Sequence, residues 1–139
     1  MINQVKLDEL KMKYVDENDE FSEMFYYEEL LKCISADIID HEDEDDWQGD
    51  SWYLFKQDDY GYLVFGWGSC SGCDALQGCK NFDEVTDLLN RLHDSIIWKS
   101  REEMLEYFET KDWNLEYYGK EPEFKRFKLR VIEHLKRED

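Results

Sequence analysis

The sequence predicts an α+β fold in which a small antiparallel sheet, built on a central hairpin over about residues 51–67, is packed by four or five helices. Two aromatic-rich runs on either side of an Asp/Gly turn predict the hairpin. Apolar residues at helical spacing elsewhere predict the helices. The length of 139 residues matches a single domain, residues 1–139. Five Trp, nine Tyr and eight Phe supply enough apolar surface for a buried core.

The hairpin is predicted from residues 51–57 and 62–67. Large side chains alternate along the first run, with Trp52 on one side and Tyr53 on the other. The intervening residues 58–61, Asp-Asp-Tyr-Gly, are typical of a tight turn. A hairpin is marginally stable by itself in water, so we expect helices to cover it.

The chain before the hairpin is predicted to be mostly helical. Residues 1–19 are ambiguous and allow one short helix. A firmer helix is predicted over about residues 22–39, with Asp19 or Ser22 as its N-cap. Its apolar residues recur at helical spacing: Met24, Tyr27, Leu30, Leu31, Ile34, Ile38 and Ile39.

Two helices are predicted directly after the cysteine-rich segment. The first runs over about residues 83–98, and Asn81 or Asp83 begins it. Ser100 and Glu103 have the spacing of a capping box, which begins a second helix to about residue 110.

The last part of the chain is predicted to be a connector and a basic helix. Residues 113–119 form a short connector or an edge strand. Pro122 then opens the last helix, because a proline in the first turn loses no hydrogen bond. This helix carries Lys125, Arg126, Lys128 and Arg130.

The chain is strongly acidic, with a formal net charge of −18 and with nineteen acidic and five basic residues in residues 1–60. A field of this sign repels nucleic acid and anionic membranes and attracts basic surfaces. No apolar run is long enough for a transmembrane helix, and the N-terminus lacks the pattern of a signal peptide. We therefore expect a cytoplasmic protein whose cysteines are thiols or metal ligands rather than disulfides.

The densest acidic segment lies at residues 37–46, which hold seven carboxylates. Repulsion at this density disfavours a helix, so we expect residues 41–46 to form an exposed loop. We expect the acidic segment to be exposed and to contact a basic partner, with Trp47 and Trp52 as aromatic anchors. A solvated linker is the alternative. A calcium loop is disfavoured by the contiguous acids and by the lack of a central glycine. The predicted binding residues are Asp37, Asp40, Glu42, Asp43, Glu44, Asp45, Asp46, Trp47, Asp50 and Trp52.

Three of the four cysteines, Cys70, Cys73 and Cys79, follow the pattern C-x-x-C-x5-C after the second strand. Two thiolates at this spacing can bind one tetrahedral zinc ion, with Cys79 as a third ligand. Redox chemistry is a second interpretation, although Asp74 opposes a thiolate at Cys73. In a third, the small side chains only let the chain turn tightly. Candidates for a fourth zinc ligand are His41, His93, Cys33 and Asp74.

Other chemistry has weaker support in the sequence. Residues 66–72 are glycine-rich and follow a strand, as a phosphate-binding loop would. No Lys-Ser/Thr pair follows them, and the surrounding charge is negative. His41, His93 and His134 are not placed beside a thiol by any motif. We therefore expect no enzymatic activity.

The segment Gly66–Gln77, Gly-Trp-Gly-Ser-Cys-Ser-Gly-Cys-Asp-Ala-Leu-Gln, resembles a stretch found in small uncharacterised proteins of bacteria and their phages. With Trp47-x-Gly49-Asp50 and the preceding strand, the resemblance covers roughly a quarter of the chain and implies no particular activity. More loosely, the size and acidity are similar to those of phage-encoded, anti-CRISPR-like inhibitors of host defence nucleases and of immunity proteins for nuclease toxins.

The main hypothesis is therefore a non-enzymatic acidic binding protein, an inhibitor that mimics nucleic acid on the basic surface of a partner such as a nuclease. Such a protein needs no cofactor and binds neither nucleic acid nor membrane directly. The alternative is a zinc- or thiol-dependent protein centred on Cys70, Cys73 and Cys79.

Overall fold

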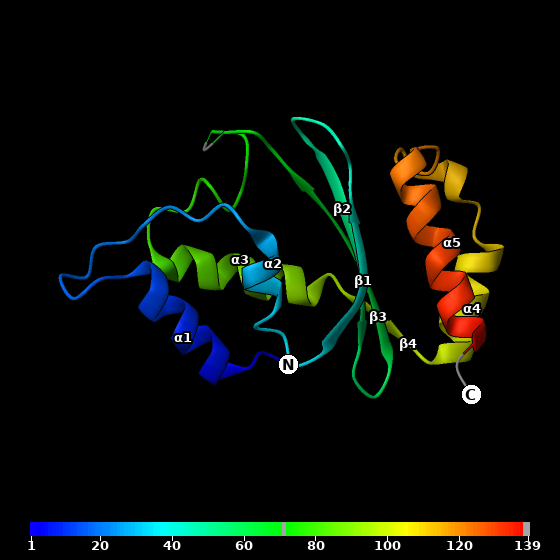
Figure 1. Cartoon of the computed structure of the whole chain (residues 1–139), viewed down its shortest axis with the longest axis horizontal. Coiled ribbons are helices and arrows are strands. Elements are labelled where there is room, and N and C mark those ends of the chain that lie inside the picture. The colour runs from blue at the N-terminus through cyan, green and yellow to red at the C-terminus, as the bar shows by residue number, and fades with distance from the viewer. Residues whose placement is uncertain (71, 138–139) are drawn as a thin grey trace. The chain divides into compact units, whose positions relative to one another are not determined.

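The computed structural model describes residues 1–70 and 72–137, and this part of the chain contains a four-stranded antiparallel sheet and five α-helices (Figure 1). The predicted α+β class is confirmed. None of the described helices has the length and apolar character needed to cross a membrane. The elements in chain order are α1 (Gln4–Tyr14), α2 (Tyr27–Leu31), β1 (Asp37–Asp43), β2 (Gly49–Lys56), β3 (Tyr60–Trp67), α3 (Phe82–Asp94), β4 (Ile97–Lys99), α4 (Arg101–Thr110), the 3₁₀ helix η1 (Trp113–Leu115) and α5 (Pro122–Arg137).

The strands lie in the sheet in the order β1-β2-β3-β4. β2 and β3 are the predicted hairpin, and the Gln57 N–H donates to the Asp59 carbonyl at 3.0 Å in the turn between them. β1 pairs with β2, beginning with Asp37 opposite Lys56, and β4 pairs with the start of β3. β1 and β4 are therefore the two edges of the sheet.

The prediction of one helix over residues 22–39 is wrong. The helix in this region is only α2, which has five residues and holds Tyr27, Leu30 and Leu31. Ile38 and Ile39 lie in β1, Ile34 forms an isolated bridge with Ile2, and Met24 precedes α2. Ile38 lies opposite Phe55 in the pairing of β1 with β2, a favourable combination of β-branched and aromatic neighbours. Pairing with the buried strand β2 therefore outweighs the helical spacing of these residues.

The helix starts predicted after the cysteine-rich segment are confirmed. Asn81 caps α3 with its side chain, Ser100 and Glu103 make both bonds of a capping box at α4, and Pro122 is the first residue of α5. The predicted end of the first of these helices is wrong. Ile97–Lys99 leaves the helical path and pairs with β3 as the short edge strand β4.

The contacts within the chain define two compact units, each built from two segments. The helical unit holds Met1–Ala36 and Trp67–Ser95, which include α1, α2 and α3. The sheet unit holds Asp37–Gly66 and Ile96–Asp139, which include nearly all of the sheet, α4, η1 and α5. The acidic segment therefore belongs to the sheet unit, and the cysteine-rich segment belongs to the helical unit.

In the sheet unit, α4 and α5 pack together on one face of the sheet, over a mainly aromatic core (Figure 1). Trp52 of β2 is fully buried, with its ring centroid 5.4 Å from that of Phe124 on α5. The buried hydroxyl groups of Tyr62 and Tyr118 lie 3.0 Å apart and satisfy one another. The core cluster consists of Trp52, Leu54, Tyr60, Tyr62, Met104, Phe108, Trp113, Tyr118, Phe124, Phe127, Val131 and Leu135.

In the helical unit, α3 supplies the main apolar face. One side of the helix is buried and the other carries charged side chains, as its spacing predicts. Met1 N lies 2.6 Å from Nε2 of His93, which links the first residue to α3. The buried residues of α1, α2 and α3 are Leu7, Leu10, Leu30, Leu31, Phe82, Val85, Leu88, Leu89 and Leu92.

Phe124→Ala is expected to lower the free energy of unfolding by about 3–5 kcal/mol, because it leaves a cavity among the rings of Trp52, Trp113 and Tyr118. Leu129→Ala on the same helix is the control. Its side chain is 68% exposed, so the change should lie within about 0.5 kcal/mol of zero. Urea unfolding of both variants measures the difference, and equal losses would contradict the assignment of the core.

Candidate functional site

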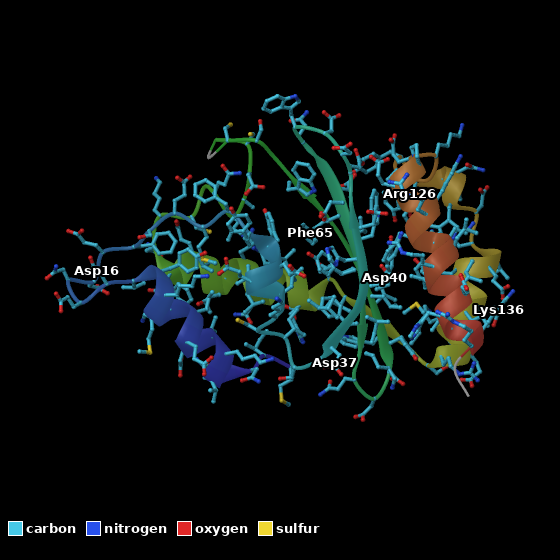
Figure 2. The ribbon with its side chains drawn as sticks, in the orientation of Figure 1. Asp16, Asp37, Asp40, Phe65, Arg126 and Lys136 are labelled. Atoms are coloured by element: carbon cyan, nitrogen blue, oxygen red, sulfur yellow. The ribbon has the colours of Figure 1, made fainter. Side chains whose placement is uncertain are left out.

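Two of the predicted binding residues, Asp40 and Glu42, are bound by an arginine of the same chain. Arg130 on α5 donates from Nε and one terminal nitrogen to the two Asp40 carboxylate oxygens, at 2.9 and 3.0 Å. Its other terminal nitrogen donates to Glu42 Oε1 at 3.1 Å. Figure 2 shows Asp40 on the side of β1 that faces α5, the helix that also carries Arg126 and Lys136. These two acids therefore hold β1 to α5.

The pairing explains why the loop predicted for residues 41–46 is wrong for residues 41–43, which belong to β1. The hydrogen bonds to Asp40 raise the pKa of Arg130, so the cation is held firmly in its charged form. Arg126 adds a second contact to Glu42, at 3.4 Å. With these charges compensated, the segment packs beside α5 as the strand β1, which forms one edge of the sheet.

The last three acids of the segment, Glu44, Asp45 and Asp46, lie beyond β1, in the turn that leads to β2. Asp45 and Asp46 are exposed, and Trp47 is 82% exposed. The Asp45 N–H donates to Glu123 Oε2 at 2.8 Å, which brings the start of α5 to this turn. Within the described residues, none of the turn's carboxylates is in an ion pair. We call the surface formed by Glu44, Asp45, Asp46, Trp47, Tyr117, Glu121 and Glu123 the acidic tip.

Repulsion among the carboxylates of the acidic tip affects the pKa of Glu44. Partial burial raises the pKa of its carboxyl, and the charges of Asp50, Glu121 and Glu123 raise that pKa further. Asp50 is buried beneath the tip and accepts a hydrogen bond of 2.8 Å from the Tyr117 hydroxyl. Burial and this hydrogen bond raise the pKa of Tyr117 to about 12, so the hydroxyl remains a neutral donor.

The structure places three other predicted binding residues, Trp52, Asp37 and Asp43, outside the acidic tip. Trp52 is 0% exposed and belongs to the aromatic core, so it is not available as a surface anchor. Asp37 is exposed at the opposite end of β1 from the tip. Asp43, the last residue of β1, accepts a hydrogen bond from Ser51 Oγ at 2.5 Å. The tip residues that sequence reasoning missed are Tyr117, Glu121 and Glu123.

In the helical unit, the cysteine-rich segment, residues 68–79, is organised by the buried carboxylate of Asp74. Oδ1 accepts hydrogen bonds from the Gly68 N–H at 2.9 Å and from the Tyr27 hydroxyl at 3.1 Å, and Oδ2 accepts one from the Gln77 N–H at 2.9 Å. Burial raises the pKa of Tyr27, and the neighbouring charge of Asp74 raises it further. We call this segment the cysteine loop.

The cysteine loop brings Cys70 and Cys73 together at its exposed end, with 2.7 Å between the two Sγ atoms. Cys73 Sγ also accepts the Cys70 N–H at 3.1 Å. The hydrogen bond between the two side chains lowers the pKa of Cys73, and backbone N–H groups lower it further. The pair is therefore chemically distinct from Cys79, whose pKa is raised by burial.

Cys79 does not join the pair, because its Sγ donates to the Ala75 carbonyl at 3.3 Å. Throughout residues 1–70 and 72–137, no three or more His, Cys, Asp or Glu side chains are arranged to hold a metal ion. A zinc site with Cys70, Cys73 and Cys79 as ligands stays a prediction, and the described residues offer it two adjacent sulfurs.

Comparison of the chain with known protein families, with curated proteins and with solved structures finds no match.

Arg130→Met is expected to lower the free energy of unfolding by about 1–2 kcal/mol, because Asp40 and Glu42 lose charged hydrogen bonds while the exposed part of the arginine limits the loss. The loss should shrink at high salt, since screening weakens the pairs being removed. Urea unfolding at two salt concentrations measures both effects.

Arg137→Met is the matched control for Arg130→Met. Arg137 lies on the same helix, and its Glu133 partner is 3.9 Å away, with both side chains more than two thirds exposed. This variant should change stability by less than about 0.5 kcal/mol. Similar losses in the two variants would mean that Arg130 acts only through the general charge of α5.

Glu44→Gln is expected to raise the free energy of unfolding at neutral pH. A carboxyl whose pKa is raised in the folded state binds its proton more readily than in the unfolded state, so stability falls as pH rises through the folded-state pKa. At neutral pH this penalty is complete, and the uncharged amide removes it. Unfolding measured across the acidic range should show a flatter pH profile for Glu44→Gln.

Glu23→Gln is the matched control for Glu44→Gln, because Glu23 is an exposed glutamate outside the acidic tip. Its stability and pH profile should follow the unsubstituted protein. A loss of stability in Glu44→Gln at neutral pH would contradict the repulsion described at the acidic tip.

Proposed function

We propose that this protein is a non-enzymatic, acidic binding protein whose acidic tip occupies a basic, nucleic-acid-binding surface on a partner protein. The partner would be a nuclease or another protein that binds nucleic acid through Lys and Arg side chains, as in phage anti-defence or in immunity to a nuclease toxin. The tip would take the place of phosphate groups, and binding would inhibit the partner by exclusion.

The observation that carries the proposal is Trp47, a large indole that is 82% exposed among carboxylates. Aromatic side chains are enriched at the centres of protein interfaces, where they bury a large area on binding. Asp45 and Asp46 directly precede Trp47 and are exposed, and Tyr117 adds a second ring, 81% exposed. An aromatic centre with a charged rim is the composition of a docking surface.

The division of acids within the sheet unit also supports the proposal. Asp40 and Glu42 already have cations of their own chain, whereas the charges around Glu44 repel one another. A partner that brings Lys or Arg to the tip would relieve this repulsion on binding. The net charge of −18 would steer such a partner from a distance and would give fast, salt-dependent association.

The proposal is tested by capture followed by kinetics. The tagged protein is incubated with a lysate of its native host, and bound proteins are eluted with double-stranded DNA. A true partner binds through the surface that DNA also uses, so DNA should release it. The same capture is run with the triple variant Glu44→Gln, Asp45→Asn and Asp46→Asn, which should not retain that partner.

With the purified partner, the triple tip variant should associate about tenfold more slowly at low salt and should show a weaker salt dependence. Trp47→Ala should instead raise the dissociation rate, by about 30-fold if the indole contributes ~2 kcal/mol. Surface plasmon resonance at two salt concentrations separates the two effects.

The matched control is a second triple variant, Glu9→Gln, Glu20→Gln and Glu23→Gln. It removes the same charge from exposed positions of the helical unit and should associate at nearly the unsubstituted rate. If both triple variants slow association equally, net charge alone matters and the acidic tip is not the binding surface.

A further inference from the structure

We propose that Cys70 and Cys73 form a redox-active dithiol, which closes reversibly to an intramolecular disulfide by exchange with small-molecule disulfides. This inference concerns the cysteine loop of the helical unit and does not depend on the function proposed for the acidic tip. It rests on the position of the two sulfurs, on their exposure and on the fixed base of the loop.

The two sulfurs are already close to bonding distance. Their separation is 2.7 Å, and a disulfide bond is about 2.05 Å long, so a small movement closes the bridge. Hydrogen bonds of 3.1 and 2.9 Å from the N–H groups of Cys73 and Asp74 to the Cys70 carbonyl hold the turn. The chain therefore prepares the geometry of the bridge before any oxidation takes place.

Both sulfurs belong to exposed residues, so a disulfide in solution can reach them. Cys73 is the better nucleophile, because its Sγ accepts a hydrogen bond from the Cys70 N–H and the hydrogen bond between the two side chains lowers its pKa. The other two cysteines are less accessible, and each thiol donates to a backbone carbonyl. Cys33 is buried and donates to the Glu29 carbonyl, and the partly buried Cys79 donates to the Ala75 carbonyl.

Asp74 and Gly68 hold Cys73 in place from the described part of the loop. Asp74, directly after Cys73, is 4% exposed and accepts three hydrogen bonds from the loop and from Tyr27. Gly68 packs so closely on Cys73 that a Cβ added there would lie 2.6 Å from its carbonyl oxygen and 2.9 Å from its Sγ. A side chain at residue 68 would thus push Cys73 out of place.

The exchange takes place in two balanced steps. The Cys73 thiolate attacks one sulfur of the small disulfide, which forms a mixed disulfide and releases one thiolate. The Cys70 thiolate then attacks Cys73 Sγ, which forms the Cys70–Cys73 bond and releases the second thiolate. The two cysteines lose two electrons in total, the small disulfide gains them, and the protons of the cysteine thiols pass to the released thiolates.

The test equilibrates the full-length protein in buffers with a range of reduced to oxidised glutathione ratios, quenches with acid and alkylates with N-ethylmaleimide. Mass spectrometry should show the loss of two alkylation sites together. A protease that cleaves before aspartate cuts between Cys73 and Asp74, so a Cys70–Cys73 bridge stays within one peptide, whereas a bridge to Cys79 links two peptides.

Matched variants identify the residues involved. Cys79→Ser should titrate at the same glutathione ratio as the unsubstituted protein. Cys70→Ser and Cys73→Ser should form no internal bridge, and Cys70→Ser should accumulate a mixed disulfide with glutathione on Cys73. The native protein should close its bridge at a ratio about tenfold less oxidising than the same chain in concentrated urea needs, a shift of about 30 mV.

Three results would overturn the proposal. In the first, both thiols remain open to alkylation at ratios that oxidise the unfolded chain. In the second, the bridge links Cys79 to one of the pair. In the third, one equivalent of zinc protects Cys70 and Cys73 in the reduced protein and blocks their oxidation, which would assign the two sulfurs to a metal.

Discussion

The sheet unit depends on the bonds that Arg130 makes with Asp40 and Glu42. When a strand places carboxylates against a helix, removing water from them costs free energy unless a cation forms hydrogen bonds with them. Arg130 supplies that cation from α5, and its planar group bonds both acids and the His41 carbonyl at once. The His41 ring stacks on Tyr53 at 5.0 Å, so successive residues of β1 serve opposite faces of the sheet.

The sequence predicts the structure correctly where residues close together in the chain determine the local conformation. The hairpin turn and the caps at Asn81 and Ser100 follow from short-range chemistry. The acidic segment did not, because its conformation depends on Arg130, which is 90 residues away. The helical spacing of residues 22–39 is misleading for the same reason. Residues 37–39 become part of a strand because they pair with β2. Only part of the acidic tip could be predicted, because the packing of α5 against β1 brings Glu123 to Asp45, and no local pattern indicates that packing.

Both candidate sites rest on a buried aspartate that is satisfied by a tyrosine. Asp50 accepts a hydrogen bond from Tyr117 beneath the acidic tip, and Asp74 accepts one from Tyr27 beneath the cysteine loop. A chain with 35 acidic and 17 basic residues has few cations to spare for its interior. Neutral hydroxyl and N–H donors satisfy these carboxylates without using any cation, and the raised pKa values of the two tyrosines keep the donors protonated.

Each compact unit is built from two separated stretches of chain, and this arrangement has a consequence during synthesis on the ribosome. The helical unit lacks α3 until residue 95 has been made, and the sheet unit lacks the complete α5 until residue 137 has been made. β1 therefore emerges with its carboxylates uncompensated and waits for Arg130. During that interval the nascent chain carries most of its negative charge and little of its basic helix. We expect mutual repulsion of the acids to keep the early segment extended and to disfavour premature collapse or self-association until α5 has been made.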